Sequence, residues 1–452
     1  LCMSQAGFAK LDARVVASLA GLYASRMLGL FMVLPVLALY IDDYQGASPF
    51  WLGLVIGAYG LTQALLQIPL GLLSDRMGRR PVIVGGLLVF ILGSVVAALS
   101  ESVWGLFIGR LLQGSGAIAS TTMALVSDLT SDENRSKAMA AIGGSIGLSF
   151  MLAMVAGPLL AAAGGMAWVF WATAALALCG LALFLLAVPK PLESSANREV
   201  RADLSQLRSV VAEPNLLRLN FSIFTLHLLL MAAFVVVPSL LVEQLGIAKQ
   251  HLWWVYIALL GGGFVLMIPL LIIGETRGRH RTVLLAAIGA LTVALFGLYL
   301  SADFWPVLVL LLLFFAGFNL LEAMLPSWLS KACPAGFRGT AMGVYSSGQF
   351  LGAFFGGLLG GWSLQQFGSS QLFLMLAMLA LFWWFLARGL SQPKLRKTVV
   401  LRRDQRTPEE FAAWLQGLPG VDEILQFDGD PLVYIKVDGK LLDRSQLEPL
   451  LA

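Results

Sequence analysis

Charged residues are scarce in this sequence. Only 12% of the 452 residues are Asp, Glu, Lys or Arg, and 58% are hydrophobic, whereas soluble domains carry about 25% charged residues. So little charge excludes an ordinary soluble enzyme and a disordered chain, because neither has so large an apolar content. The mean hydropathy of +0.83 and the 47 glycines are instead typical of membrane-spanning helices.

Cysteine and histidine are also scarce, with three residues of each. The cysteines are far apart and form no Cys-x-x-Cys pair, which argues against a disulfide framework and a thiolate metal site. The histidines are not spaced as metal ligands, and the phosphate-binding loop of ATP-using proteins is absent from the sequence. We therefore expect no metal and no cofactor. The pI near 9.0 does not predict nucleic-acid binding, because excess Lys and Arg usually mark the cytoplasmic loops of a membrane protein.

Twelve mostly apolar segments are each long enough, at ~20 residues, to span a bilayer. They are residues 14–41, 51–73, 81–100, 104–127, 137–163, 166–188, 217–242, 252–274, 282–301, 305–329, 340–362 and 371–390. With the N-terminus inside, almost every Lys and Arg of the connecting loops falls on the inner side, and Lys249 alone falls outside. This bias predicts an all-α, multi-pass membrane protein with both termini in the cytoplasm.

The two halves of the chain repeat one another. The segment Phe31–Pro35 in the first span recurs as Phe234–Pro238 in the seventh, and Pro69–Arg79 recurs as Pro269–Arg279 at nearly the same spacing. The repeat predicts two pseudo-symmetric six-helix bundles related by duplication. Transporters built in this way bind their substrate near the midplane, between the halves.

The predicted organisation follows from this repeat and from a change in charge. Residues 1–188 and 217–397 are the two six-helix bundles, and residues 189–216 are a cytoplasmic linker that is either partly an amphipathic helix or unstructured. Residues 398–452 are much richer in charge, so we expect a separate cytoplasmic domain there.

The tail is expected to fold as strand, helix, strand, turn, strand and helix. Thr407-Pro408-Glu409-Glu410 is a strong helix start, Asp428–Pro431 is the expected turn, and Arg444–Leu451 the expected last helix. This order resembles a ferredoxin-like α+β domain. The tail has no Cys, His or Met, which argues against the copper site that this shape suggests. Regulation or partner binding is one interpretation, and a passive stabilising cap is the other.

The loop after the second span holds the most specific motif. It runs Gly71-Leu-Leu-Ser-Asp75-Arg76-Met-Gly78-Arg79-Arg80 and resembles the signature loop of the major facilitator superfamily. Gly71 allows a neighbouring helix to approach closely. Asp75 suits the N-terminus of a facing helix, and Arg79 suits an acid such as Asp128. The resemblance implies a latch that holds one state of an alternating-access cycle. The alternative is that these arginines only fix the topology.

Two further motifs resemble that family. Arg110-Leu-Leu-Gln113-Gly114-Ser-Gly116 in the fourth span is similar to its R-x-x-Q-G-x-G pattern, whose Arg acts in coupling in proton-coupled members; a buried Arg satisfied by carbonyl groups is the alternative. Gly157-Pro158 in the fifth span matches only part of the antiporter signature, because Ala153 stands where a Gly is expected. This pair favours antiport or, equally, simple helix packing.

Polar side chains within the spans are the candidate site residues. Glu322 is the only acid well inside a span, and a carboxyl group in a low-dielectric cavity can bind and release a proton near neutral pH. His227 can titrate too, although a lone His on an apolar helix more often serves packing. We expect Arg26, Gln113 and Asn319 to line the substrate cavity between the two halves. There Arg26 favours an anionic substrate or pairs with an acid.

The resemblance implies a proton-coupled secondary transporter of the bacterial inner membrane that exports small amphipathic organic compounds, works as a monomer and needs only the proton gradient. Its partners are the lipid bilayer, the substrate and protons, with no nucleic acid. A symporter or importer on the same scaffold is one alternative. A membrane sensor whose tail is the output is another. An enzyme is not expected, since the spans hold no nucleophile–base pair.

Overall fold

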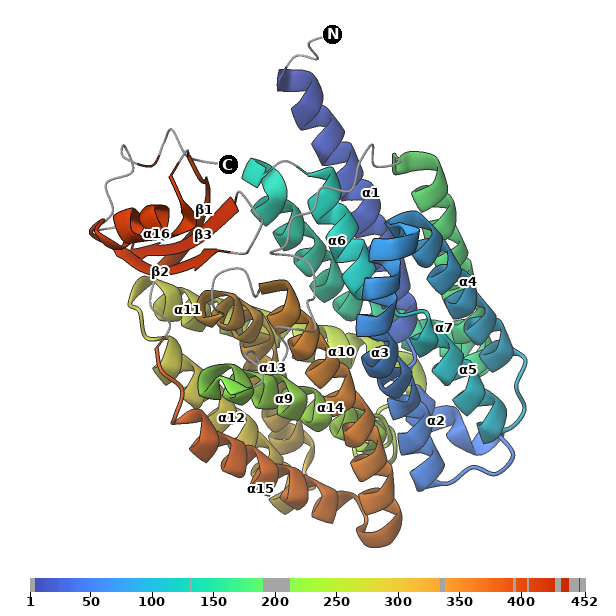
Figure 1. The fold of residues 1–452 in the computed structure, drawn as a ribbon. Helices are drawn as coiled ribbons and strands as arrows, with labels where there is room; N and C mark the ends of the chain where they lie inside the picture. The colour runs from blue at the N-terminus through green and yellow to red at the C-terminus, as the bar shows by residue number, and fades with distance from the viewer. Residues whose placement is uncertain are drawn as a thin grey trace.

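The computed structural model describes residues 5–130, 132–189, 212–333, 338–392, 396–404, 406–426, 432–438 and 447. Long helices pack lengthwise, with a small sheet at the end where the N-terminus lies (Figure 1). The elements are α1 (Gln5–Phe31), α2 (Leu37–Tyr40), η1 (Ile41–Asp43), α3 (Pro49–Met77), α4 (Arg79–Ala98), α5 (Val103–Ser115), α6 (Ala119–Leu129), α7 (Asp132–Ala187), α9 (Pro214–Ser239), η3 (Leu240–Gln244), η4 (Lys249–His251), α10 (Leu252–Tyr256), η5 (Ile257–Gly261), α11 (Gly262–Thr276), α12 (His280–Leu300), α13 (Phe304–Ala332), α14 (Arg338–Phe367), α15 (Ser369–Ala387), β1 (Arg396–Arg402), α16 (Pro408–Gln416), β2 (Val421–Gln426) and β3 (Leu432–Asp438).

Eight helical segments of the described chain are long and apolar enough to cross a membrane. One of them, Ala141–Ala187, covers two predicted spans, and its backbone leaves the helical conformation at Gly164 and Gly165. Two other predicted spans are interrupted. A turn separates α1 from α2 around Pro35, which has no amide hydrogen to donate, and residues 116–118 separate α5 from α6.

The helices form two groups that follow the sequence repeat. In the first group α1 packs on α7 and α5 packs on α3 and α4, and in the second α14 packs on α9 and α12 packs on α13 and α15. Gly78 and Gly278, which follow the second and eighth predicted spans, both have positive φ, of 90° and 61°. Side chains disfavour this conformation, so glycine ends the helix at the same place in each half.

The two groups meet closely along the antiparallel helices α3 and α14, which lie side by side in Figure 1. A Cβ atom on Gly53 would overlap the Gly357 carbonyl oxygen, and one on Gly57 would lie 2.7 Å from that of Phe354. Glycine is therefore needed where these two backbones touch, as in other tight membrane helix pairs.

Polar contacts between the groups gather at the α2 end, meaning the end of the bundle with α2, η1 and the start of α3. Lys249 donates a hydrogen bond of 3.0 Å to the Leu39 carbonyl and lies 4.6 Å from the centre of the Tyr40 ring. The Gln365 side chain accepts a hydrogen bond of 3.1 Å from the Phe50 amide at the start of α3. These contacts hold the halves together at the α2 end.

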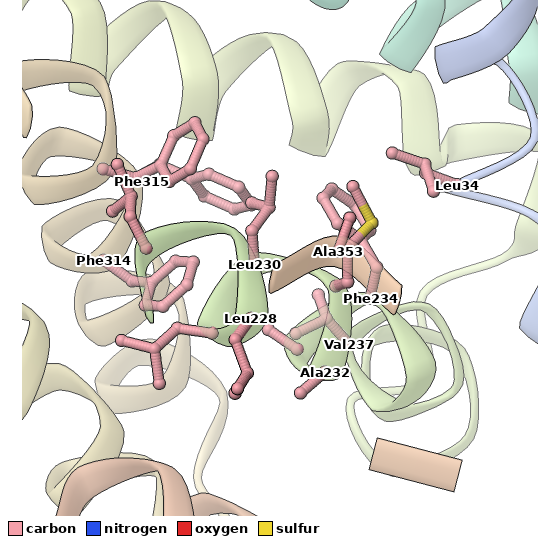
Figure 2. Close-up of a cluster of buried hydrophobic side chains, with 14 of the residues drawn as sticks. Leu34, Leu228, Leu230, Ala232, Phe234, Val237, Phe314, Phe315 and Ala353 are labelled. Carbon is pink, nitrogen blue, oxygen red and sulfur yellow. The ribbon is translucent and has the colours of Figure 1, made fainter. Parts of the chain in front are cut away.

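Apolar side chains from both groups share one core. Leu34, from the turn after α1, is drawn in the same cluster as Phe234 of α9, Phe314 and Phe315 of α13 and Ala353 of α14 (Figure 2). All five are buried. In a bilayer this packing stabilises the fold through close van der Waals contact rather than through transfer from water, so the halves are joined by shape complementarity as well as by polar groups.

The tail forms a three-stranded antiparallel sheet in the order β1-β3-β2. Strands β1 and β2 both pair with β3 and are joined through α16, which is a split β-α-β unit. The Thr407 hydroxyl accepts from the Glu410 amide, and the Glu410 carboxylate accepts from the Thr407 amide, so α16 starts with the expected capping box. Strand β1 begins slightly before the predicted boundary. Apart from Leu447, the expected turn and last helix lie outside the described residues, as does most of the linker.

Candidate functional site

Three polar side chains from three helices of the second group meet in one cluster. Glu322 comes from α13, His227 from α9 and Gln349 from α14. The side-chain nitrogen of Gln349 lies 2.8 Å from Nε2 of His227 and donates to Oε1 of Glu322 at 3.3 Å. Oε2 of Glu322 lies 3.8 Å from Nε2 of His227. The fold therefore brings together the two titratable groups that the sequence singled out.

The neighbours of His227 define one neutral tautomer. Nδ1 lies 3.3 Å from the Ile223 carbonyl oxygen, which can only accept, so Nδ1 carries the proton. In the neutral ring Nε2 then accepts a hydrogen bond, and the amide group of Gln349 supplies it. That amide group has a second hydrogen for the carboxylate of Glu322. The arrangement thus fits a neutral ring whose Nε2 accepts one hydrogen of the Gln349 amide group while Oε1 of Glu322 accepts the other.

Glu322 is the more exposed titratable member of the cluster. Its side chain is 39% exposed, against 10% for His227, although its Oε2 atom is buried without a hydrogen-bond partner among the described residues. Tyr345 lies close enough to interact electrostatically with Glu322, and its buried hydroxyl has no hydrogen-bond partner in the described part of the chain. Asn319 is half-buried on α13, three residues before Glu322 and on the same helix face.

Aromatic rings connect the two groups beside this cluster. Phe150 of α7 packs 5.1 Å from Phe31 in its own group, and 6.5 Å and 6.4 Å from Phe234 and Phe318 in the other. The Phe318 ring lies 5.9 Å from that of His227. Phe31 and Phe234 are equivalent in the sequence repeat, so each half places the same residue against Phe150.

A second polar cluster lies in the first group around Arg26, which is 1% exposed. Its Nη2 atom donates to the Tyr59 hydroxyl, to Oε1 of Gln63 and to the Gly116 carbonyl, each at 2.9 Å. These partners are neutral, and no acid pairs with Arg26 among the residues that the structure describes. The Tyr59 ring lies 6.1 Å from that of Phe350 on α14, so this cluster adjoins the seam between the groups.

Arg110 and Gln113 hold each other inside the first group. Arg110 donates to Oε1 of Gln113 at 2.8 Å, and Gln113 donates to the Ser94 hydroxyl at 2.8 Å. Arg110 also lies 5.4 Å from the centre of the Tyr59 ring. Gln113 is fully buried between α5 and α4, so in this conformation it orients Arg110. Its contact with substrate stays a prediction.

The signature loop forms a compact ionic cluster. Arg79 pairs with Asp75 and, at 3.3 Å, with Asp128, and donates to the Ser74 hydroxyl at 2.6 Å. The side chains of Arg79 and Asp128 are each 7% exposed. The expected ion pair between Arg79 and Asp128 is thus present. It ties the start of α4 to the end of α6, and the pair with Asp75 adds the end of α3.

The other motif glycines and arginines lie against named neighbours. Arg80 donates to the Val188 carbonyl and lies 5.1 Å from the centre of the Phe184 ring, whereas Arg76 is exposed. A Cβ on Gly71 would lie 3.1 Å from the Ser120 hydroxyl of α6. These contacts stay within the first group.

Gly157 packs against the turn that interrupts the first span. A Cβ atom there would overlap the Met32 carbonyl oxygen and lie 3.1 Å from Cγ of Pro35. The helix continues through Pro158 and leaves helical torsions only at Gly164 and Gly165. Close packing is therefore the role visible for Gly157-Pro158.

Sequence analysis missed Gln349, Tyr59 and Gln63. A usable signal existed, because each is a polar residue in an otherwise apolar span, where polar side chains are expensive and tend to be functional. Within the described chain, no group of three or more His, Cys, Asp or Glu side chains is arranged to hold a metal ion.

Two groups of apolar helices, joined at a seam beside the cluster of His227, Gln349 and Glu322, are the arrangement typical of a membrane transport protein. Comparison with known families then names the class. The chain belongs to the Major Facilitator Superfamily, whose model matches residues 19–328 and 219–417.

Relatives and solved structures agree with this assignment. The inner membrane transport protein YajR of Escherichia coli (strain K12) is 44% identical over 97% of each chain. The multidrug resistance protein MdtH of Aeromonas salmonicida (strain A449) is 28% identical over 76% of this chain and 86% of its own. A bacterial homologue of the human lysosomal transporter Spinster, in an inward-facing and occupied conformation, covers 85% of this chain and 97% of its own with a TM-score of 0.69. At 14% identity that likeness concerns the fold alone.

Proposed function

We propose that this protein exports small amphipathic organic compounds across the inner membrane in exchange for protons, by alternating access. The observation that carries the proposal is the cluster of His227, Gln349 and Glu322. It joins an imidazole and a partly exposed carboxyl group through one amide, beside the aromatic contacts of the seam. The similarity to a multidrug resistance protein supports amphipathic compounds as the substrate class.

Protonation of this cluster would change its hydrogen bonds. A proton on Nε2 of His227 removes the acceptor for the Gln349 amide, and a proton on Glu322 weakens the other bond. Gln349 belongs to α14, the helix that packs on α3 of the opposite half. Proton binding would therefore loosen α14 from α9 and α13, which couples the protonation state to the seam where the halves move.

We propose twelve spans with both termini in the cytoplasm. The interrupted helices α1–α2 and α5–α6 each count as one span, and α7 counts as two. The Lys and Arg bias then places the α2 end outside and the Arg79 end inside. The proton gradient is the energy source, with no metal or organic cofactor. We also propose a working monomer, since each chain supplies both halves of one site.

We propose that the signature loop is a latch for the cytoplasmic end. Along α3 and α14, Gly57 lies against Phe354 and Ala64 against Ser347. The same antiparallel register, extended, would bring Asp75 opposite the start of α14 when the two helices close along this end. A carboxylate at a helix N-terminus stabilises by about 0.3–1 kcal/mol, and Arg79 and Asp128 hold the position of Asp75.

The test uses inside-out vesicles with purified protein, an acid interior and a pH-sensitive dye inside. Amphipathic compounds are added outside, and substrate-triggered loss of interior protons is measured. We expect release in the wild type and none with Glu322→Gln. The matched control is Glu243→Gln, an exposed acid at the α2 end, which should keep release.

Other results have distinct meanings. Proton release that survives Glu322→Gln would mean that another residue carries the proton. The next variants to test are then His227→Gln and Asp128→Asn. No release from the wild type across the compound set refutes antiport and favours a symporter or importer, or a membrane sensor.

We propose that the tail is a ferredoxin-like domain for regulation. Deleting it should leave transport intact and change only the response to cell conditions, whereas loss of folding would make it a stabilising cap.

A further inference from the structure

The fourth predicted span is broken in the middle of the first group. Helix α5 ends at Ser115, residues Gly116 to Ile118 are not helical, and α6 begins at Ala119. The Ile118 amide donates to the Gly116 carbonyl at 2.8 Å, which turns the chain sharply. The break is buried, because Ala117 and Ile118 are at most 1% exposed. Within the membrane-spanning part of a protein, non-helical backbone is tolerated only where it is buried in protein or lines a cavity.

The start of α6 leaves main-chain donors unused. Its N-cap residue, Ile118, supplies no side-chain acceptor. The Thr122 amide bonds to the Ile118 carbonyl, but no described group accepts from the amides of Ala119, Ser120 and Thr121. Together these amides carry the positive end of the dipole of an eleven-residue helix.

Arg26 reaches the same break and is itself under-used. Its Nη2 atom bonds to the Gly116 carbonyl, but its Nε and Nη1 atoms are buried without an acceptor among the described residues. The hydroxyl groups of Thr121 and Thr122, in the first turn of α6, are also buried without a partner there. Side-chain donors and main-chain donors thus gather independently within one turn of the break.

The distribution of charged side chains in the first group also favours an anion at the break. Arg26 and Arg110 are both buried in the first group. The acids of that group whose side chains are described stand at its two ends: Asp42, Asp43 and Glu101 at the α2 end, and Asp75 and Asp128 at the other. The interior therefore holds two guanidinium groups without a carboxylate, and a buried charge that lacks a counter-ion is costly. A bound anion would remove that cost.

We propose that the break in the fourth span is a subsite for a carboxylate group, and that the transported compound is an amphipathic molecule carrying one. The free Nε and Nη1 atoms of Arg26 can each donate a charge-assisted hydrogen bond to a carboxylate oxygen, and the start of α6 supplies amides, as broken helices do for anionic groups in other transporters. This inference rests on the proposed transport function and specifies its substrate.

Access to the subsite runs past Tyr59. The Tyr59 hydroxyl bonds to Arg26, and its ring packs on Phe350 of the opposite half. A movement of α14 away from α3 uncovers Tyr59 and then the guanidinium. The subsite is therefore closed while the two helices touch here, and it opens with the seam.

The experiment measures binding to the full-length protein in lipid nanodiscs at pH 7, with three probes that share one chain: decanoate, decanol and decyltrimethylammonium. A charge-assisted carboxylate site predicts that decanoate binds the wild type roughly tenfold or more tightly than decanol. Arg26→Gln should abolish this preference, and Arg26→Lys should keep part of it. Arg388→Gln, which removes an exposed guanidinium, should leave it unchanged.

A second variant keeps the test valid if Arg26→Gln does not fold. Thr121→Val keeps the side-chain shape at a fully buried position and should reduce the preference several-fold. Equal binding of decanoate and decanol to the wild type overturns the subsite, and so does a preference that survives both Arg26→Gln and Thr121→Val. No proton gradient is used. Failure of proton exchange in vesicles would therefore refute the proposed function without affecting this result.

Discussion

Replacing Gly57 by alanine should open the α2 end of the transporter. Gly57 touches the backbone of α14, and the new Cβ atom would lie 2.7 Å from the Phe354 carbonyl oxygen and 3.1 Å from its Cα. Both atoms belong to the backbone of a long helix, so neither can rotate away. The clash exists only while α3 and α14 are in contact, because separated helices accommodate a methyl group freely.

The size of the shift toward the open state can be worked out because the clash raises the free energy of the closed state alone. Ordinary contact begins near 3.4 Å, so α14 must retreat by roughly 0.7 Å or the closed state must bear the strain. Overpacking of this kind costs about 1–3 kcal/mol. Because the open state does not share the cost, the closed-to-open ratio should fall by about 5–150-fold.

The assay is a distance measurement between spin labels on the two halves at the α2 end. Labels at Glu101→Cys and Asp303→Cys, in a background without the native cysteines, should show a longer distance population in Gly57→Ala. Gly85→Ala is the matched control, because a Cβ there meets nothing within 4 Å. Gly86→Ala clashes with Ile118 inside one half and should lower stability without changing the distances. An unchanged distribution in Gly57→Ala would refute the reasoning.

Two smaller predictions follow. Lys249→Met removes the bond to Leu39 and the Tyr40 contact, worth about 0.5–1 kcal/mol at an exposed site, so the same labels should report a two- to fivefold shift toward the open α2 end. Thr407→Ala removes the cap of α16 and should cost the tail about 1 kcal/mol, measured by hydrogen exchange of α16 amides in the full chain. The Thr407 amide and hydroxyl hold the pKa of Glu410 below its usual value. The stabilisation that the Glu410 carboxylate gives to α16 is therefore present at pH values above the ordinary pKa of Glu. It is lost as the pH falls through the lowered pKa of Glu410. The difference between wild type and mutant should shrink in acid, where the Thr407 hydroxyl loses its bond to the Glu410 carboxylate, but it should not vanish, because the Glu410 amide still donates to that hydroxyl. An undiminished difference in acid would contradict the part that the carboxylate plays in the cap.

Much of the architecture was predictable because the sequence repeat preserves residues that the backbone conformation requires. Gly78 and Gly278 occupy equivalent positions in the two halves, and both have the positive φ that ends their helices. The interruptions were harder. The break at residues 116–118 was missed because Gly114 and Gly116 fit a motif within one continuous apolar segment, and hydropathy does not register a break whose residues are themselves apolar.

The site was predictable only in part, for a physical reason. Charged residues such as Glu322 and Arg26 stand out in an apolar span because burying them is costly. Gln349 and Tyr59 carry no charge, and their importance depends on which helices become neighbours. That neighbourhood is set by tertiary packing of α14 against α3 and α9, which a single sequence does not reveal.

The sequence repeat gives the two clusters a common origin. The spacing that relates Phe31 to Phe234 also relates Gly116 to Asn319 and Ala119 to Glu322. In the second half α13 runs unbroken through this place and carries a carboxylate, whereas in the first half the chain unwinds and α6 begins there, beside Arg26. Equivalent positions therefore favour opposite charges.

This polarity constrains how transport couples to protons. A purely anionic substrate at the Arg26 subsite is favoured when Glu322 is protonated, because protonation removes a like charge. Binding of the anion and the proton would then assist each other, which is the sign required for symport. Antiport requires competition, and a substrate that also carries a cationic group supplies it by taking the place of the proton at Glu322. The proposed exchange and the proposed subsite are thus both satisfied by an amphipathic zwitterion, with its carboxylate in the first half and its cation in the second.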